Sequence, residues 1–183
     1  MRKLLAALLA LLLVIPCAFA EEEPAATKVP EPKWRGNYVY YLLEDGTAEI
    51  SFYMGSSEPE ESLVIPDSLD GIPVTSIGKD AFMDDSLKEI TIPDTVTRIR
   101  DKAFEWSESL TKITIPDSVT DMGANPFTGC GNLTEIIVSP DHPYLEIVDG
   151  VLFSKPDHRL VSYPFANTAA SYVVPDGTEQ PEE

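Results

Sequence analysis

A set of apolar residues recurs along the chain at a nearly constant interval, and this period constrains the fold more than any other feature of the sequence. One apolar triplet occurs three times at steps of 23 residues: Leu87, Ile90 and Ile92; Leu110, Ile113 and Ile115; Leu133, Ile136 and Val138. Three more apolar positions recur with it at steps of 22 and then 23 residues: Val74, Val96 and Val119; Ile77, Ile99 and Met122; Phe82, Phe104 and Phe127. A fixed period of this length is typical of a solenoid, in which each repeat forms one coil.

The spacing within one repeat predicts a short strand followed by a turn. Ile113 and Ile115 are two residues apart, so they share one face of an extended strand while the residues between and before them face the other way. Pro116 ends the strand because proline has no backbone N–H to donate to a sheet. The Ala103-Phe104 pair of the preceding repeat is expected to fill the coil from the far side after a helical turn. One coil cannot bury these residues alone, but stacked coils form a continuous core.

The repeats carry a family resemblance. The pattern I-P-D-[ST]-V-T-x-I-x-x-x-A-F-x-x-x-x-x-L-x-x-I-x-I runs from Ile92 to Ile115 with minor departures. It resembles the BspA-type leucine-rich repeat of secreted and surface bacterial proteins, and the likeness covers roughly residues 35–177. The sequence departs from the common leucine-rich repeat in lacking a regular Asn ladder, and Pro126 stands where the pattern has Ala. We therefore expect a mainly β fold: a short leucine-rich-repeat solenoid with 23-residue coils, flanked by β-hairpins.

The folded domain is expected over residues 34–177, with the repeats at about 63–138. Two β-prone runs within 38–54 are separated by Asp45-Gly46, a strong hairpin signal. Both faces of the first run are apolar or aromatic, so one face should cover the core and the other be partly covered, with an aromatic ligand platform as an alternative. In the C-terminal hairpin region, 139–177, segments 147–154 and 159–163 predict a second hairpin. We assign the hairpins as end covers, because a terminal coil offers unpaired strand edges.

After Val138 the regular step fails, and Val174-Pro175-Asp176 resembles one more copy of the Ile-Pro-Asp motif 36 residues further on. The chain ends soon afterwards, so the C-terminal cover is expected to be incomplete. Outside the domain, an acidic, proline-rich linker is expected at 21–33 and a similar tail at 178–183.

Residues 1–20 are expected to be a secretory signal peptide. Arg2 and Lys3 precede a twelve-residue apolar run, and Ala18-Phe19-Ala20 is a small-x-small cleavage pattern. The run is shorter than the roughly 18 to 20 apolar residues that span a bilayer, although a permanent membrane anchor is an alternative. Lipidation of Cys17 is another, although Pro16 stands where bacterial lipoproteins usually have a small residue. No later stretch is long and apolar enough to span a membrane, so we expect no transmembrane helix in the mature chain.

The charge of the chain excludes some functions, and its sequence contains no catalytic motif. The formal net charge is −18, and removal of residues 1–20 takes away two cations and no anion, which makes it −20. Such a chain is a poor match for nucleic acid or any other polyanion. The sequence contains no nucleophile elbow, phosphate-binding Gly loop, dinucleotide fingerprint or paired His on a helix. We therefore expect no enzyme activity and no cofactor.

Two weaker candidates for chemistry remain. Asp141-His142 and Asp157-His158 would form a two-His, two-carboxylate metal site if the C-terminal hairpin brought them together; the alternative is two exposed turns. Cys130 is the only cysteine that follows residue 20, so the mature chain can form no internal disulfide. We interpret Cys130 as a small apolar side chain inside a coil, with a catalytic thiol as the alternative.

The outward residues of the stacked strands are the candidate partner-binding strip. With strands in register at about 4.8 Å, they form two columns: Glu89, Lys112 and Glu135; Thr91, Thr114 and Ile137. The alternative is a solvated strand face with no partner. The resemblance implies a secreted or cell-surface bacterial module that binds an extracellular protein or glycan and mediates adhesion. Two alternatives are a lipid-anchored envelope scaffolding protein and an uncharacterised hydrolase. The sequence does not indicate the oligomeric state.

Overall fold

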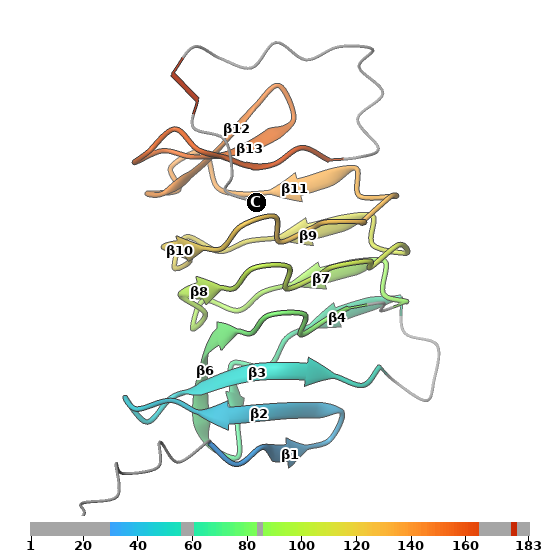
Figure 1. Ribbon diagram of the computed structural model, residues 1–183, viewed down its shortest axis with the longest axis vertical. Helices are drawn as coiled ribbons and strands as arrows, with labels where there is room; N and C mark the ends of the chain where they lie inside the picture. Colours follow the sequence, from blue (N-terminus) through green and yellow to red (C-terminus); the bar gives the residue numbers. More distant parts are fainter. Residues whose placement is uncertain (1–29, 56–60, 84–85, 165–176, 179–183) are drawn as a thin grey trace, which may run out of the picture.

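The computed structural model describes residues 30–55, 61–83, 86–164 and 177–178. The expected signal peptide, Cys17 and the Val174-Pro175-Asp176 motif lie outside these residues. The described part contains strands and turns and no helix, which confirms the mainly β fold. The coils stack along the long axis of the molecule, with a strand sheet at each end (Figure 1).

Each coil contributes one strand to each of two sheets, and neighbouring coils pair in parallel. The first sheet consists of β4 (Ser62–Val64), β7 (Glu89–Thr91), β9 (Lys112–Thr114) and β11 (Glu135–Ile137). The second contains the parallel strands β6 (Ile72–Ile77), β8 (Arg98–Ile99) and β10 (Asp121–Met122). The sequence predicted β7, β9 and β11 of the first row and neither β4 nor the second row. Within the second row, β8 and β10 have two residues each, which is too short to show an alternating pattern.

The first coil is longer than the others because it contains a hairpin. β5 (Ser68–Leu69) pairs antiparallel with β6 across Asp70 and Gly71, whose φ angles are 53° and 78°. Positive φ at both central residues is typical of the tight turn that Asp-Gly favours. The hairpin is tied to the N-terminal sheet, since Tyr40 Oη donates to Asp70 Oδ2 at 2.7 Å.

The N-terminal cover has three strands rather than a hairpin alone, and these strands continue the second sheet. β2 (Tyr38–Leu42) and β3 (Ala48–Tyr53) form the expected hairpin, and β3 continues into the solenoid by pairing parallel with β6. β1 (Lys33–Arg35) adds an antiparallel edge strand to β2. It begins at Lys33, one residue before the expected start of the domain, and its three exposed residues carry no strand pattern.

The C-terminal cover also has three strands. β12 (Leu145–Val148), β13 (Val151–Ser154) and β14 (Leu160–Ser162) form an antiparallel sheet in that order. The pairing of β13 with β14 is the expected second hairpin. The first arm, expected as one strand over 147–154, is instead split by a turn at Asp149 and Gly150, whose φ angles are 51° and 80°.

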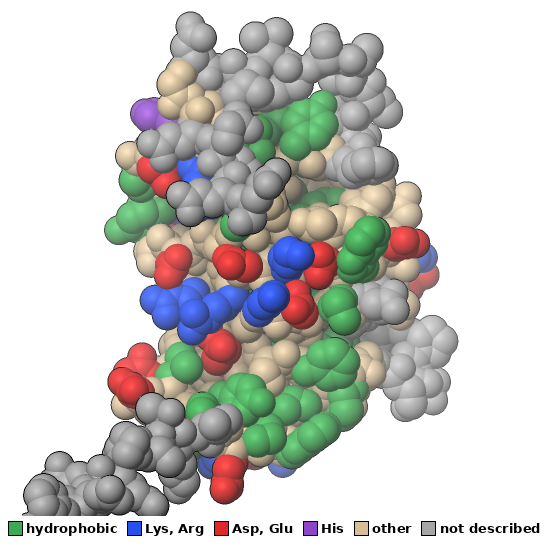
Figure 2. Space-filling view, in the orientation of Figure 1, with side chains coloured by type: hydrophobic (Ala, Val, Ile, Leu, Met, Phe, Trp, Pro, Cys, Tyr) green, Lys and Arg blue, Asp and Glu red, His purple; other side chains and the backbone are tan. Residues whose placement is uncertain are grey.

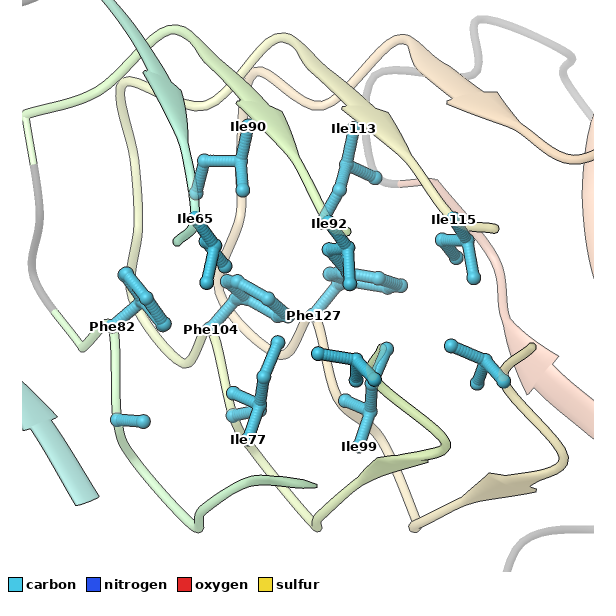
Figure 3. Close-up of a cluster of buried hydrophobic side chains, with 14 of the residues drawn as sticks. Ile65, Ile77, Phe82, Ile90, Ile92, Ile99, Phe104, Ile113, Ile115 and Phe127 are labelled. Carbon is cyan, nitrogen blue, oxygen red and sulfur yellow. The ribbon is translucent and has the colours of Figure 1, made fainter. Parts of the chain in front are cut away.

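Stacked apolar columns form the core, and the aromatic column reaches both the N-terminal cover and the last coils. The rings of Phe82 and Phe104 are 5.4 Å apart, and those of Phe104 and Phe127 are 5.5 Å apart, both with an interplanar angle of 21°. Tyr53 of β3 extends the stack, with its ring 5.4 Å from that of Phe82. Figure 3 shows the phenylalanines side by side, with isoleucines reaching them from both sheets.

The segment that carries Ala103 and Phe104 is a series of turns and not the expected helical turn. Lys102 and Trp106 have φ angles of 55° and 60°. A left-handed residue on each side of Phe104 interrupts any right-handed helix. The two buried side chains nevertheless point into the coil, as their spacing predicted.

Candidate functional site

The six predicted strip residues lie in two columns across the first parallel sheet. Glu89 pairs with Lys112, and Lys112 with Glu135. Thr91 pairs with Thr114 in the same way, and Thr114 with Ile137. Residues in register on parallel strands point to the same face of a sheet. The coils therefore bring together side chains that lie 23 positions apart in the sequence.

Strand β4 extends both columns by one coil, which the sequence analysis missed. Ser62 pairs with Glu89 and Val64 pairs with Thr91. Ser62-Leu63-Val64 precedes Ile65-Pro66-Asp67 as Glu89-Ile90-Thr91 precedes Ile92-Pro93-Asp94, and this alignment could have identified both residues. We define the strand strip by eight residues: Ser62, Val64, Glu89, Thr91, Lys112, Thr114, Glu135 and Ile137.

The first column of the strand strip alternates in charge. Lys112 Nζ lies 3.8 Å from Glu135 Oε2, and both side chains are substantially exposed. A second pair lies beside the strip, where Lys88 Nζ is 2.5 Å from Glu61 Oε1. The hydrogen bond from Lys88, together with its charge, holds the pKa of Glu61 below its usual value. These exposed pairs contribute little to stability. A contribution to folding therefore does not account for the charged residues at these positions.

The second column has aliphatic side chains at both ends and hydroxyls between them. Val64 is 70% exposed, the highest value among the large apolar residues of the described chain. Thr91 is exposed, and Thr114 and Ile137 are half-buried. The inward residues of the same strands, Ile90 and Ile113, are buried in the core, so they anchor the sheet behind the column.

A second apolar surface lies on the outer face of the N-terminal sheet. Trp34, Val39 and Phe52 pair across β1, β2 and β3, so the three side chains stand in one row. Trp34 is 62% exposed and Phe52 is 42% exposed, whereas Val39 between them is buried. Figure 2 shows hydrophobic side chains gathered at the N-terminal end of the molecule. This row is the partly covered face that the sequence predicted for the first hairpin.

Charged residues of both signs lie between this apolar area and the C-terminal end (Figure 2). Arg98 Nε is 2.6 Å from Asp121 Oδ2, and Arg100 Nε is 2.8 Å from Glu49 Oε2. Ser76 Oγ also donates to Glu49 Oε2 at 2.7 Å. The Arg98–Asp121 pair joins successive coils, whereas Glu49 of β3 ties the N-terminal cover to the coils that carry Ser76 and Arg100.

His142 has a structural role in the C-terminal cover. Its ring is fully buried, and Nδ1 accepts hydrogen bonds from the backbone N–H groups of Tyr144 and Leu145 at 3.1 and 3.0 Å. Nε2 therefore carries the proton and donates to the Pro116 carbonyl at 3.0 Å. His158 is exposed in the turn before β14. Within the described residues, no group of three or more His, Cys, Asp or Glu side chains could hold a metal ion.

Cys130 is buried inside the third coil, as expected for a small side chain at this position. Its Sγ donates to the Phe104 carbonyl at 3.0 Å. Burial raises the pKa of the Cys130 thiol to about 12. Because the thiolate is the nucleophilic form, this geometry opposes a catalytic role.

Stacked coils of about 23 residues, each with a short outward strand and an inward apolar column, define a leucine-rich repeat protein. The family model for the BspA type leucine rich repeat region, in six copies, matches residues 51–158. The chain therefore belongs to the BspA-type leucine-rich repeat family. Within the described residues, no helix is long and apolar enough to cross a membrane.

Several solved structures are similar to this chain. A leucine rich cell surface protein from Faecalibacterium prausnitzii A2-165 is 20% identical with a TM-score of 0.42, and the match covers 84% of this chain and 66% of that one. The pneumococcal vaccine antigen PcpA is 19% identical with a TM-score of 0.33, covering 83% and 60%. A leucine-rich repeat protein from Bacteroides capillosus ATCC 29799 is 25% identical with a TM-score of 0.44, covering 59% and 98%.

The chain thus spans less than two thirds of the length of the first two of these structures. No curated protein shows a significant match.

Proposed function

We propose that this chain is a non-catalytic binding module, secreted or held at a bacterial cell surface, and that it contacts a protein partner through the strand strip. The observation that carries the proposal is the register of β4, β7, β9 and β11, which sets eight outward side chains in two straight columns. Family membership supports a surface location, because one of the similar structures is described as a cell surface protein.

The composition of the strand strip favours a protein partner. A protein interface needs an apolar contact area next to polar groups that fix the register. Val64 and Ile137 supply apolar contact at the two ends of one column, and Thr91 and Thr114 supply hydroxyls between them. The neighbouring column offers carboxylates on both sides of Lys112. A partner with a basic residue beside aliphatic ones would match this arrangement.

A double substitution tests the strip without touching the core. Lys112→Glu combined with Ile137→Ser reverses one charge and removes one aliphatic contact. Lys79→Glu combined with Leu42→Ser makes the same chemical changes at two exposed positions outside the strip. Binding of both variants and the unaltered chain to immobilised extracellular-matrix proteins would be measured by biolayer interferometry. Loss of binding in the first variant alone supports the proposal, and equal binding by all three rejects the strip as the contact surface.

A lipid-anchored scaffolding protein would have a different N-terminal residue from the secreted module proposed here. Signal-peptide cleavage before Glu21 gives a mature chain that begins with an unmodified glutamate, whereas lipidation gives one that begins with a modified Cys17. Mass spectrometry of the N-terminal peptide from the exported protein distinguishes the two products.

A further inference from the structure

A cavity of about 230 Å³ lies where the last coil meets the C-terminal cover. One wall is the segment that ends in β10, and the other is formed by residues around β12, by Ser154 and by the turn before β14. The cavity is therefore built from two parts of the chain that are packed against the same core. It lies on the second sheet, so it is separate from the strand strip.

The repeat geometry leaves backbone acceptors at this cavity. In the coil below, the Thr97 carbonyl accepts hydrogen bonds from Thr120 N and Asp121 N at 2.9 and 3.2 Å. The corresponding carbonyl of the last coil belongs to Thr120, which lines the cavity and receives no hydrogen bond from the described residues. The next carbonyl in the row, that of Met122, accepts from Arg159 Nη2 at 2.8 Å. A side chain thus replaces one missing coil donor, and none of the described residues replaces the other.

The charges around the cavity balance in pairs. Arg98 holds Asp121 at 2.6 Å, and Arg159 Nε lies 3.4 Å from Asp157 Oδ2. A hydrogen bond from Ser154, with smaller contributions from Arg159, lowers the pKa of Asp157, which therefore stays ionised at neutral pH. Each carboxylate retains lone pairs that can accept further hydrogen bonds. With each carboxylate paired to an arginine, the site has no strong preference for a cation or an anion.

An aromatic side chain completes the lining. Tyr144 is 40% exposed and borders the cavity, while Leu145 and Met122 form apolar parts of the wall. The volume is below the roughly 300 to 1,000 Å³ of clefts that enclose drug-sized ligands. The space suits one small ring rather than an extended chain.

We propose that this cavity binds a single neutral sugar residue, such as the terminal unit of a glycan. The Tyr144 ring would lie against the C–H face of the sugar, and the carboxylates of Asp121 and Asp157 would accept hydrogen bonds from its hydroxyls. The Thr120 carbonyl supplies one more acceptor. The inference does not depend on the strand strip, so either site can fail experimentally without the other.

The test uses the purified chain and neutral monosaccharides as probes. Glucose, galactose, mannose and N-acetylglucosamine would be screened by saturation-transfer NMR, with cationic glucosamine and anionic sialic acid as charged comparisons. We expect at least one neutral sugar to bind and to outcompete its charged analogues. Absence of binding by every neutral sugar, or binding of the charged sugars only, would overturn the proposal.

Variants localise the binding. Tyr144→Ala and Asp121→Asn should each weaken sugar binding by about tenfold or more, which corresponds to about 1.4 kcal/mol. Tyr144→Phe keeps the ring and should retain binding, and Trp34→Ala removes an exposed aromatic at the opposite end and should leave binding unchanged. Since Asp121 is exposed and outside the core, its variant reports on the cavity even if Tyr144→Ala disturbs the cover. Unchanged binding in both cavity variants places the sugar elsewhere and rejects the site.

Discussion

Ser107 and Cys130 occupy the same position in successive coils, and each donates a hydrogen bond to the phenylalanine carbonyl of the coil before it. Ser107 Oγ lies 2.6 Å from the Phe82 carbonyl oxygen, and Cys130 Sγ lies 3.0 Å from that of Phe104. Both side chains are 1% exposed. The position therefore requires a small side chain that donates a hydrogen bond, and the reactivity of sulfur plays no part in it.

Serine should replace Cys130 with little loss of stability. Cys130→Ser keeps a donor at the same place, as Ser107 does one coil below, whereas Cys130→Ala leaves the Phe104 carbonyl without it. We expect the alanine variant to be less stable than the serine variant by about 1 kcal/mol in urea unfolding. An alanine variant as stable as the serine variant would show that the hydrogen bond is unimportant.

The buried thiol also predicts a loss of stability in alkaline solution. The pKa of Cys130 is about 12 in the folded chain and about 8.5 in an unfolded one. Because the folded chain holds this proton more tightly, stability is unaffected below about pH 8.5 and falls as the pH rises from there towards 12, by on the order of 1 kcal/mol per pH unit.

Urea unfolding at several pH values would measure this effect, with Cys130→Ser as the control that lacks a thiol. Above pH 8.5, the unfolding free energy of the unaltered chain should fall relative to that of Cys130→Ser. Parallel pH dependences of the two proteins would contradict the prediction. Alkylation by iodoacetamide at pH 8.5 should label Cys130 only after unfolding.

Gly129 should not tolerate a side chain, for two separable reasons. A Cβ atom at this position would lie 2.6 Å from Cε3 of the Trp106 indole, and the φ angle of Gly129 is +76°. We expect Gly129→Ala to lower the unfolding free energy by about 1 kcal/mol or more. Adding Trp106→Ala removes the clash and not the backbone strain, so the double variant should recover part of the loss. A purely additive pair would show that the indole does not press on this backbone.

His142 should hold the C-terminal cover to the third coil. Its ring bridges the Pro116 carbonyl to the backbone N–H groups of Tyr144 and Leu145. His142→Ala removes all three hydrogen bonds, so hydrogen exchange should accelerate in β12 and β13 while β7 remains protected. Uniform acceleration along the whole chain would instead indicate global destabilisation. Substitution of the exposed His158 by alanine is the matched control.

The solenoid was predictable because the core positions repeat at a fixed step. Ile90 and Ile113 are equivalent by sequence alone, and β7 and β9 follow from them. Arg98 and Asp121 gave no such signal, since in β8 and β10 only one residue of each strand is buried. The repeat period therefore predicted β7, β9 and β11 of the first sheet, whereas the short strands of the second sheet depend on how the coils pack.

The sugar-binding cavity could not be inferred from the repeat. Thr120 belongs to the last coil and Tyr144 to the cover, and the 23-residue period ends between them. Their proximity depends on how the cover packs, which is fixed by contacts such as that of His142 with Pro116. By contrast, the strand strip lies wholly within the repeats, so its columns followed directly from the sequence.

The equal spacing of the inner coils also has a consequence at the level of the gene. A coil of 23 residues is encoded by 69 nucleotides, a whole number of codons. Duplication or deletion of one such unit preserves the reading frame and leaves the two terminal sheets unchanged. We expect such a change to alter only the distance between the two ends, because each inner coil packs on its neighbours through the same positions.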